Sequence, residues 1–242
     1  MRDIILLVLR AILFDLNGVL VDDEPLHLEL FRKVLAEEEI SLSEGEYFER
    51  YLGRDDKRCF FDVLRAEGRR CDDALLMRLL TRKASYYQER VRAEGFPFFP
   101  GALELIRAAA EKSVTLGVVS NALRREIQAA LRQPALEPLF KVVVAAEDVN
   151  EAKPDPEGYL RALSDLNSVP PLPIRLYHPH EVLAVEDSPI GLEAAGAAGL
   201  VTLGVAHTYP PEELAAADLV VADLGEICLD RLQQQLAEVS RS

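Results

Sequence analysis

Four polar clusters in this sequence follow short apolar runs and contain residue types that could act on an anionic group. Asp15, Glu186 and Asp187 supply carboxylate oxygens, the ligands that Mg²⁺ prefers. A carboxylate can also attack phosphorus and form a covalent intermediate, while the ammonium of Lys153 neutralises charge on the transferred group. The clusters occupy residues 15–17, 120–121, 153–155 and 186–187.

Each cluster taken singly is also explained as a helix cap. Ser120, Asn121, Asp155 and Asp187 are all residue types that favour the position before a helix, and a cap carries no catalysis. The functional interpretation therefore requires the four clusters to lie together. We expect this if each follows a strand of one parallel sheet, because ligands gather beyond the carboxyl ends of such strands.

The composition limits the classes of function. The 242 residues include 27 basic and 41 acidic side chains, which gives a net charge of −14. This charge argues against a nucleic-acid partner, which requires a basic surface. It also means that an anionic substrate must meet local positive charge or a metal.

Three cysteines without a CxxC pair indicate reduced thiols. We expect a cytoplasmic protein, a monomer or weak homodimer, with no nucleic-acid or membrane partner.

The N-terminal apolar run begins at Ile4 and is interrupted by Arg10. It is shorter than the roughly 20 residues that a membrane span needs, and no small-residue cleavage site follows it. We interpret it as an edge strand or an irregular start before the first core strand.

Short aliphatic runs alternate with helical patterns over most of the chain. This alternation predicts an α/β fold with a doubly wound parallel sheet, whose strands are buried on both faces. Pro154 and Pro189 suit the first turn of a helix. The predicted strands are 11–15, 114–120, 141–146, 182–186, 200–205 and 219–222, and the predicted helices are 100–112, 122–132, 154–166 and 189–198.

Residues 23–96 contain no strand candidate and predict an all-helical cap inserted after the first strand. Ser43 and Glu46 have the spacing of a capping box. Apolar stripes at helical spacing are His27, Leu30, Phe31, Val34 and Leu35, then Phe60, Phe61 and Leu64, then Leu76, Leu79, Leu80, Ala84, Tyr87 and Val91. The predicted domains are an α/β catalytic core of residues 1–22 and 97–242 and a helical cap of residues 23–96.

Four ordered motifs make the sequence similar to a known superfamily: FDLNGVLVDDEP, VVSNA, KPDPEGY and VEDSPIGLEAA. The chain resembles the haloacid dehalogenase-like (HAD) superfamily, with a helical cap of the β-phosphoglucomutase and phosphoglycolate phosphatase type, over residues 11–225. The resemblance implies Asp15 as nucleophile and Ser120, Asn121 and Lys153 as phosphate-binding residues. It further implies Mg²⁺ held by Asp15, Glu186, Asp187 and the main-chain carbonyl of Asn17.

Asn17 departs from the motif, because the family's phosphatases and mutases normally have a second aspartate there that transfers protons. An amide does not titrate near neutral pH, and such proton transfer is worth about 10²–10⁴-fold in rate. A substitute acid or base would restore it, and the candidates near the cap joint are Asp22, Asp23, Glu24 and His27. Packing accounts for His27 equally well. Two alternatives stay open: a catalytically silent protein that binds a phosphorylated ligand or partner, and an engineered or sequencing change at Asn17.

We therefore predict a Mg²⁺-dependent phosphatase acting on a small phosphorylated metabolite through an aspartyl-phosphate. A mutase is disfavoured because it needs proton transfer in both directions. A 2-haloacid dehalogenase is disfavoured because such enzymes lack the paired acids found here at Glu186 and Asp187. Gly53 and Arg54 resemble the family's substrate-specificity loop, in which the guanidinium would grip a substrate oxygen. A helix-entry turn capped by Asp55 or Asp56 accounts for the same stretch.

Overall fold

The structure, a computed structural model, describes residues 9–51, 56–132 and 135–239, with the backbone alone for 235–239. Internal contacts divide the chain into two compact units, Met1–Asp22 with Pro97–Ser242 and Asp23–Phe96. We call them the α/β unit and the helical unit. The apolar run expected to form an edge strand falls largely within residues 1–8, outside the described residues, as do Gly53, Arg54 and Asp55.

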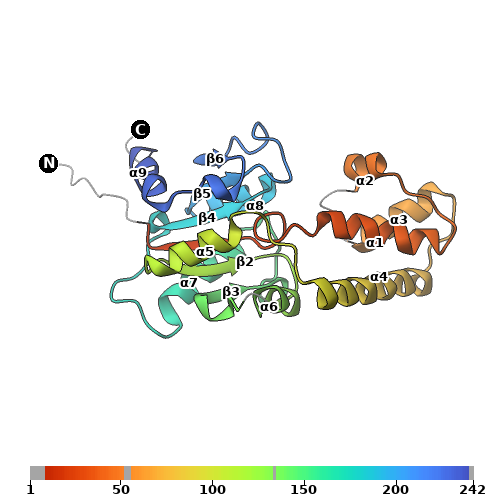
Figure 1. Ribbon diagram of the computed structural model, residues 1–242, viewed down its shortest axis with the longest axis horizontal. Coiled ribbons are helices and arrows are strands. Elements are labelled where there is room, and N and C mark those ends of the chain that lie inside the picture. Colours follow the sequence, from red (N-terminus) through yellow and green to blue (C-terminus); the bar gives the residue numbers. More distant parts are fainter. Residues whose placement is uncertain (1–8, 52–55, 133–134, 240–242) are drawn as a thin grey trace. The chain divides into compact units, whose positions relative to one another are not determined.

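A parallel sheet forms the centre of the α/β unit (Figure 1). Its strand order is β3-β2-β1-β4-β5-β6, so consecutive strands lie on either side of β1 and the sheet is doubly wound, which confirms the predicted fold class. The strands are β1 Ala11–Phe14, β2 Thr115–Val119, β3 Phe140–Val144, β4 Val182–Glu186, β5 Val201–Val205 and β6 Leu219–Val221.

Strand β1 shows why these short runs form strands. All four of its residues are buried, and successive side chains point to opposite faces of the sheet. Ala11 and Leu13 join a core cluster with residues of helices α7 and α8, so Ile12 and Phe14 are covered on the other face. Burial on both faces explains the continuous apolar character of the run.

Helices α5 to α8 connect strands of the sheet, so that the carboxyl ends of these parallel strands lie at the same edge, and α9 follows the last strand. The helices are α5 Ala102–Glu111, α6 Arg124–Arg132, α7 Glu157–Ser168, α8 Pro189–Ala197 and α9 Leu229–Val239, with short 3₁₀ turns at Glu137–Leu139, Ala146–Asp148, Pro179–Glu181 and Leu224–Glu226. None of the helices in the described ranges combines the length and the apolar character that a bilayer crossing requires.

The predicted position of Pro154 in a first helical turn is wrong, whereas Pro189 begins α8 as predicted. Helix α7 starts at Glu157 because the preceding turn satisfies its own backbone groups. The Asp155 carboxylate accepts a hydrogen bond from the Glu157 N–H at 2.9 Å. The Glu157 carboxylate accepts from the N–H groups of Asn150 and Glu151 at 2.9 and 3.0 Å.

The helical unit consists of α1 Glu24–Ala36, α2 Glu44–Arg50, α3 Asp56–Ala66 and α4 Asp73–Glu94 among its described residues. Ser43 and Glu46 form the predicted capping box, with the Ser43 hydroxyl accepting from the Glu46 N–H at 3.2 Å. The predicted stripes supply its core: Leu30, Phe31, Val34, Leu35, Phe60, Leu64, Leu76, Leu79 and Val91 are all buried.

The stripe predicted for α4 is wrong at Ala84, which is exposed, while the adjacent Lys83 is only 1% exposed. The Lys83 ammonium lies 2.6 Å from Asp56 Oδ1 and 2.6 Å from His27 Nδ1. It also sits 4.0 Å from the centroid of the Phe31 ring, a cation–π contact. These contacts explain how Lys83 is buried on the face of α4 that packs into the core. The Asp56 carboxylate, the His27 imidazole and the Phe31 ring together replace water around its ammonium.

Candidate active site

The segment after β1 presents Asp15 at the carboxyl edge of the sheet. The Asp15 N–H donates to the Val185 carbonyl at 3.0 Å, which holds the first turn residue against β4. Leu20 and Val21 both donate to the Leu16 carbonyl, so the chain turns back within a few residues. The Asp15 side chain is 14% exposed, which leaves one carboxylate accessible in an otherwise buried edge.

Gly18 completes this turn for a steric reason. Its φ of +76° lies in the left-handed region. A Cβ at this position would lie 1.9 Å from Asp187 Oδ2, so the backbone of the turn packs directly against the carboxylate that follows β4. The sequence motif therefore needs glycine here both for the turn and for the approach of Asp187.

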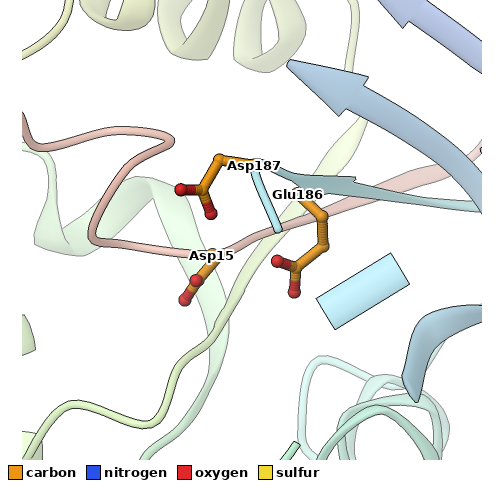
Figure 2. Close-up of side chains that lie close together, drawn as sticks. All are labelled: Asp15, Glu186 and Asp187. Atoms are coloured by element: carbon orange, nitrogen blue, oxygen red, sulfur yellow. The ribbon is translucent and has the colours of Figure 1, made fainter. Parts of the chain in front are cut away.

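Three carboxylates converge at this edge (Figure 2). Asp15, Glu186 and Asp187 each offer one oxygen, and these oxygens all lie within 4.8 Å of one another. Glu186 is the last residue of β4 and is fully buried, and Asp187 follows it. Because β1 and β4 are adjacent parallel strands, their ends bring together residues that are far apart in the chain.

Lys153 reaches the same point from the loop between β3 and α7. Its ammonium lies 3.2 Å from Asp15 Oδ1 and 2.7 Å from Glu186 Oε1, and it donates to the Val119 carbonyl at 2.8 Å. The Lys153 ammonium thus contacts two carboxylates and the carbonyl of the last residue of β2. The cluster therefore holds three carboxyl groups and a single ammonium group.

Tyr159 is a residue of this site for which the sequence predicted no role. It lies in the first turn of α7, is fully buried, and its hydroxyl donates a hydrogen bond to Glu186 Oε1. The signal was present, because Tyr159 ends the motif KPDPEGY that also contains Lys153. A buried tyrosine needs a hydrogen-bond partner, and here the carboxylate provides it.

The electrostatics of the cluster follow from burial. Burial and the nearby Asp15 charge raise the pKa of Glu186 to about 8, although Lys153 and Tyr159 oppose the shift. Burial and Asp15 also raise the pKa of Asp187 to about 7. For Lys153, burial lowers the pKa, but the charges of Asp15 and Glu186 outweigh it, and the net direction is upward. The positive charge of Lys153 is therefore too small to offset the burial of Glu186 and Asp187 and their repulsion by Asp15.

A divalent cation fits this set of donors. Glu186 Oε2 is buried and has no hydrogen-bond partner among the described residues, which is costly for a carboxylate oxygen. Gly191 in α8 permits this position, because a Cβ there would lie 1.9 Å from that same oxygen. Hard carboxylate oxygens with an unsatisfied charge are the donors that such cations bind. The contribution of the Asn17 main-chain carbonyl stays a prediction.

Ser120 and Asn121 lie beside Lys153, and the three residues line one small hollow. The Ser120 hydroxyl accepts from the Ala122 N–H at 3.2 Å, and Asn121 Oδ1 accepts from the Lys153 N–H at 3.4 Å. Ser120 and Asp155 thus form local turn contacts of the kind that the capping interpretation expects. Asp187 does not cap α8, because Ser188 takes that role.

Comparison with known proteins agrees with this geometry. The family model described as haloacid dehalogenase-like hydrolase matches residues 12–205. This chain belongs to the HAD-like hydrolases. The resemblance identified from the four motifs is therefore confirmed, and the chain is an enzyme of the HAD-like phosphatase and hydrolase class.

Two relatives of this HAD-like hydrolase are named as phosphatases, and a similar solved structure contains bound phosphate. The phosphorylated carbohydrates phosphatase of Thermotoga maritima is 32% identical over 83% of this chain and 87% of its own length. The validoxylamine A 7'-phosphate phosphatase of Streptomyces hygroscopicus subsp. limoneus is 29% identical over 90% of this chain and 95% of its own. The structure of CbbY from Rhodobacter sphaeroides in complex with phosphate is 26% identical, with a TM-score of 0.74 over 90% of this chain and 96% of that one.

His27 of this HAD-like hydrolase lies in the helical unit and belongs to a polar network rather than to an apolar stripe. Its Nε2 is 3.2 Å from Asp23 Oδ2 and its ring stacks on Tyr87 with centroids 5.1 Å apart. The Tyr87 hydroxyl also donates to Asp23, at 2.7 Å. Burial raises the pKa of Asp23, but His27 and Tyr87 reverse the shift and the net direction is downward. A role of His27 toward substrate stays a prediction.

Proposed function

We propose that this HAD-like hydrolase is a Mg²⁺-dependent phosphatase that acts on a small phosphorylated metabolite through an aspartyl-phosphate at Asp15. The observation that carries the proposal is the convergence of Asp15, Glu186 and Asp187 at one point, with the ammonium of Lys153 in contact with Asp15 and Glu186. The relatives named for phosphorylated carbohydrates and validoxylamine A 7'-phosphate support a small phosphorylated compound as the class of substrate.

In the proposed reaction, a carboxylate oxygen of Asp15 attacks phosphorus. The new O–P bond forms as the bond from phosphorus to the leaving oxygen breaks, and water then hydrolyses the acyl phosphate to regenerate Asp15. Lys153 neutralises charge on the transferred group, and the Ser120 hydroxyl donates to one of its oxygens. A bound Mg²⁺ would supply further positive charge that offsets the repulsion between the carboxylate and the phosphate.

Tyr159 and Lys153 keep Glu186 oriented for the cation, because both contact Oε1 and leave Oε2 without a protein partner among the described residues. Glu186 and Asp187 would bind the ion together with Asp15. Their burial keeps water from competing for the same oxygens and strengthens each electrostatic interaction.

Asn17 determines which substrates are expected to react fastest. An amide cannot protonate a leaving oxygen, so alkyl phosphates lose the general-acid contribution of about 10²–10⁴-fold. Acyl phosphates, whose leaving group scarcely needs a proton, lose little. We therefore propose a preference for substrates with good leaving groups, in contrast to a mutase, which transfers a phosphoryl group between sugar hydroxyls.

The test compares hydrolysis of acetyl phosphate and of an alkyl sugar phosphate, with and without Mg²⁺. We expect Mg²⁺-dependent hydrolysis that is faster for acetyl phosphate, with phosphate trapped on Asp15 after acid quenching. Asp15→Ala should reduce the rate by at least about 10³-fold. Asn17→Asp should raise alkyl phosphate hydrolysis by about 10²-fold or more and leave acetyl phosphate nearly unchanged.

The alternative function, a catalytically silent protein that binds a phosphorylated ligand, is favoured by Asn17 alone. It predicts that wild type and Asp15→Ala have equal rates on every phosphorylated compound tested. It also predicts no gain from Asn17→Asp, because a site without a competent nucleophile cannot use a restored acid.

A further inference from the structure

The loop after β5 contacts the turn that carries Asp15 and Asn17, although none of the four sequence motifs includes this loop. His207 Nδ1 lies 2.9 Å from the Gly18 carbonyl oxygen. A carbonyl only accepts, so the imidazole donates from Nδ1 and its tautomer is defined. The carbonyl held by this bond belongs to the peptide between Gly18 and Val19, directly after Asn17, and the Gly18 backbone also packs against Asp187.

The imidazole ring has a second contact, on the segment that returns to the α/β unit. It stacks on Phe99 with ring centroids 3.8 Å apart and an interplanar angle of 14°. Phe99 is itself paired with the departing segment, because its N–H donates to the Leu20 carbonyl at 2.9 Å. His207 therefore lies where the turn after β1, the returning segment and the end of β5 meet.

Thr208 extends the contact to the acidic cluster. Its side chain forms a hydrogen bond with the Asp187 carboxylate. Its hydroxyl also lies 3.0 Å from the place that a Cβ on Gly18 would occupy. Two consecutive residues of one loop thus contact the Gly18 peptide and the side chain of Asp187.

The hydrogen bond from Nδ1 distinguishes histidine from other rings at this position. His207 Nε2 is buried and has no hydrogen-bond partner in the described part of the chain. A phenylalanine would stack on Phe99 equally well and would add no unsatisfied polar atom of its own. What histidine adds is the donor to the Gly18 carbonyl.

We propose that His207 is a positioning residue for the divalent-cation site, because it holds the Gly18 peptide and so sets the position of the Asn17 main chain relative to Asp187. This inference rests on the proposed function, which places a cation among Asp15, Glu186 and Asp187. Groups that orient metal ligands in this indirect way commonly change metal affinity by about 10–100-fold when they are removed.

The experiment uses two matched pairs and measures metal binding rather than turnover. Wild type and His207→Phe share a stacking ring and differ in the donor, while His207→Asn and His207→Leu share a shape and differ in the donor. Mn²⁺ dissociation constants are measured by electron paramagnetic resonance, with Mg²⁺ as competitor, on variants whose folding is checked by circular dichroism. In each pair, the member without the donor should bind Mn²⁺ about tenfold more weakly.

Tyr177→Phe is the control, because it removes a side-chain contact of similar length, 2.7 Å to Thr115 Oγ1, at the opposite edge of the sheet. It should leave the dissociation constant for Mn²⁺ unchanged.

Asp187→Asn should abolish Mn²⁺ binding. If Asp187→Asn abolishes binding but the folded pair members agree within about twofold, His207 has no positioning role and only this inference is wrong. If wild type binds neither ion, the proposed function fails as well. The Asn and Leu pair gives the answer even where His207→Phe does not fold.

Discussion

The ammonium of Lys153 lies 2.7 Å from Glu186 Oε1, and both side chains are buried, with 6% and 0% exposure. The same ammonium is 3.2 Å from Asp15 Oδ1, so one cation is shared by two carboxylates at the carboxyl ends of the adjacent strands β1 and β4. A buried charge that loses its partner is strongly destabilising, whereas an exposed ion pair contributes little. If the proposed function is right, activity and stability should both depend on these three side chains.

Lys153→Met should reduce phosphatase activity by at least about 10²-fold, because the transferred group loses a preorganised positive charge. It should also lower the free energy of unfolding by about 3–5 kcal/mol without metal, because two carboxylates stay buried without their cation. Phosphatase assays measure the first effect, and urea unfolding with and without Mg²⁺ measures the second. Lys141→Met is the control, because Lys141 Nζ donates to the main-chain carbonyls of Leu166 and Pro171. Equal losses in the two variants would contradict the special position of Lys153.

Gly191→Ala should destabilise the protein, although alanine normally stabilises a helix relative to glycine by roughly 0.5–1 kcal/mol. The added Cβ would lie 1.9 Å from Glu186 Oε2 and must displace that carboxylate, at a cost of about 1–3 kcal/mol. Gly196→Ala in the same helix meets no atom within 4 Å and should show the ordinary stabilisation. Thermal unfolding of the two variants measures both effects. If Gly191→Ala raised the melting temperature as Gly196→Ala is expected to do, Glu186 would be able to move aside at no cost in stability.

Tyr159→Phe removes the hydroxyl that donates to Glu186 Oε1 in a fully buried place. We expect a loss of about 1.5–3 kcal/mol in the free energy of unfolding, the range for hydrogen bonds to charged groups, together with a weaker apparent Mg²⁺ affinity. Tyr86→Phe removes an exposed hydroxyl that donates to Glu37 Oε1 at 2.7 Å and should cost much less. The measurements are urea unfolding and Mg²⁺ titration of activity. An unchanged Mg²⁺ dependence in Tyr159→Phe would contradict its orienting role.

Glu181→Gln should destabilise the protein in a pH-dependent way. Burial raises the pKa of Glu181, but Arg175, the His178 N–H and Arg10 outweigh it and lower the pKa from 4.5 to about 2. A depressed pKa means that the carboxylate stabilises the fold above about pH 4.5 and loses this contribution as the pH falls toward about 2. We expect a difference of about 1–3 kcal/mol near neutral pH, reduced by the exposure of Arg175.

Unfolding of wild type and Glu181→Gln is compared at a series of pH values between about 7 and 3, the range over which the linkage acts. The difference between the two proteins should shrink as the pH falls below about 4.5. A difference that stays constant over this range would show that Glu181 contributes through packing and not through its charge.

Local patterns in the sequence by themselves predicted most of the helices and strands. Continuous runs buried on both faces predicted the strands, and β4 has the predicted bounds 182–186. Stripes at helical spacing predicted α1, α3 and α4, and the Ser43–Glu46 capping box predicted α2. The apolar patterns and the capping box both involve residues that are close in the chain, so they can be recognised in a single sequence. The motifs likewise predicted that Asp15, Lys153 and Asp187 belong together, through the rule for parallel strand ends.

Only the tertiary structure decided what surrounds those residues. The burial of Lys83, the hydroxyl of Tyr159 on Glu186 and the imidazole of His207 on the Gly18 carbonyl join segments that are far apart in the chain. The start of α7 at Glu157 also depended on side-chain contacts to Asn150 and Glu151 that local propensity does not include. Such contacts depend on the three-dimensional packing of whole elements, and the energy of a buried charge depends on every neighbour that replaces water around it.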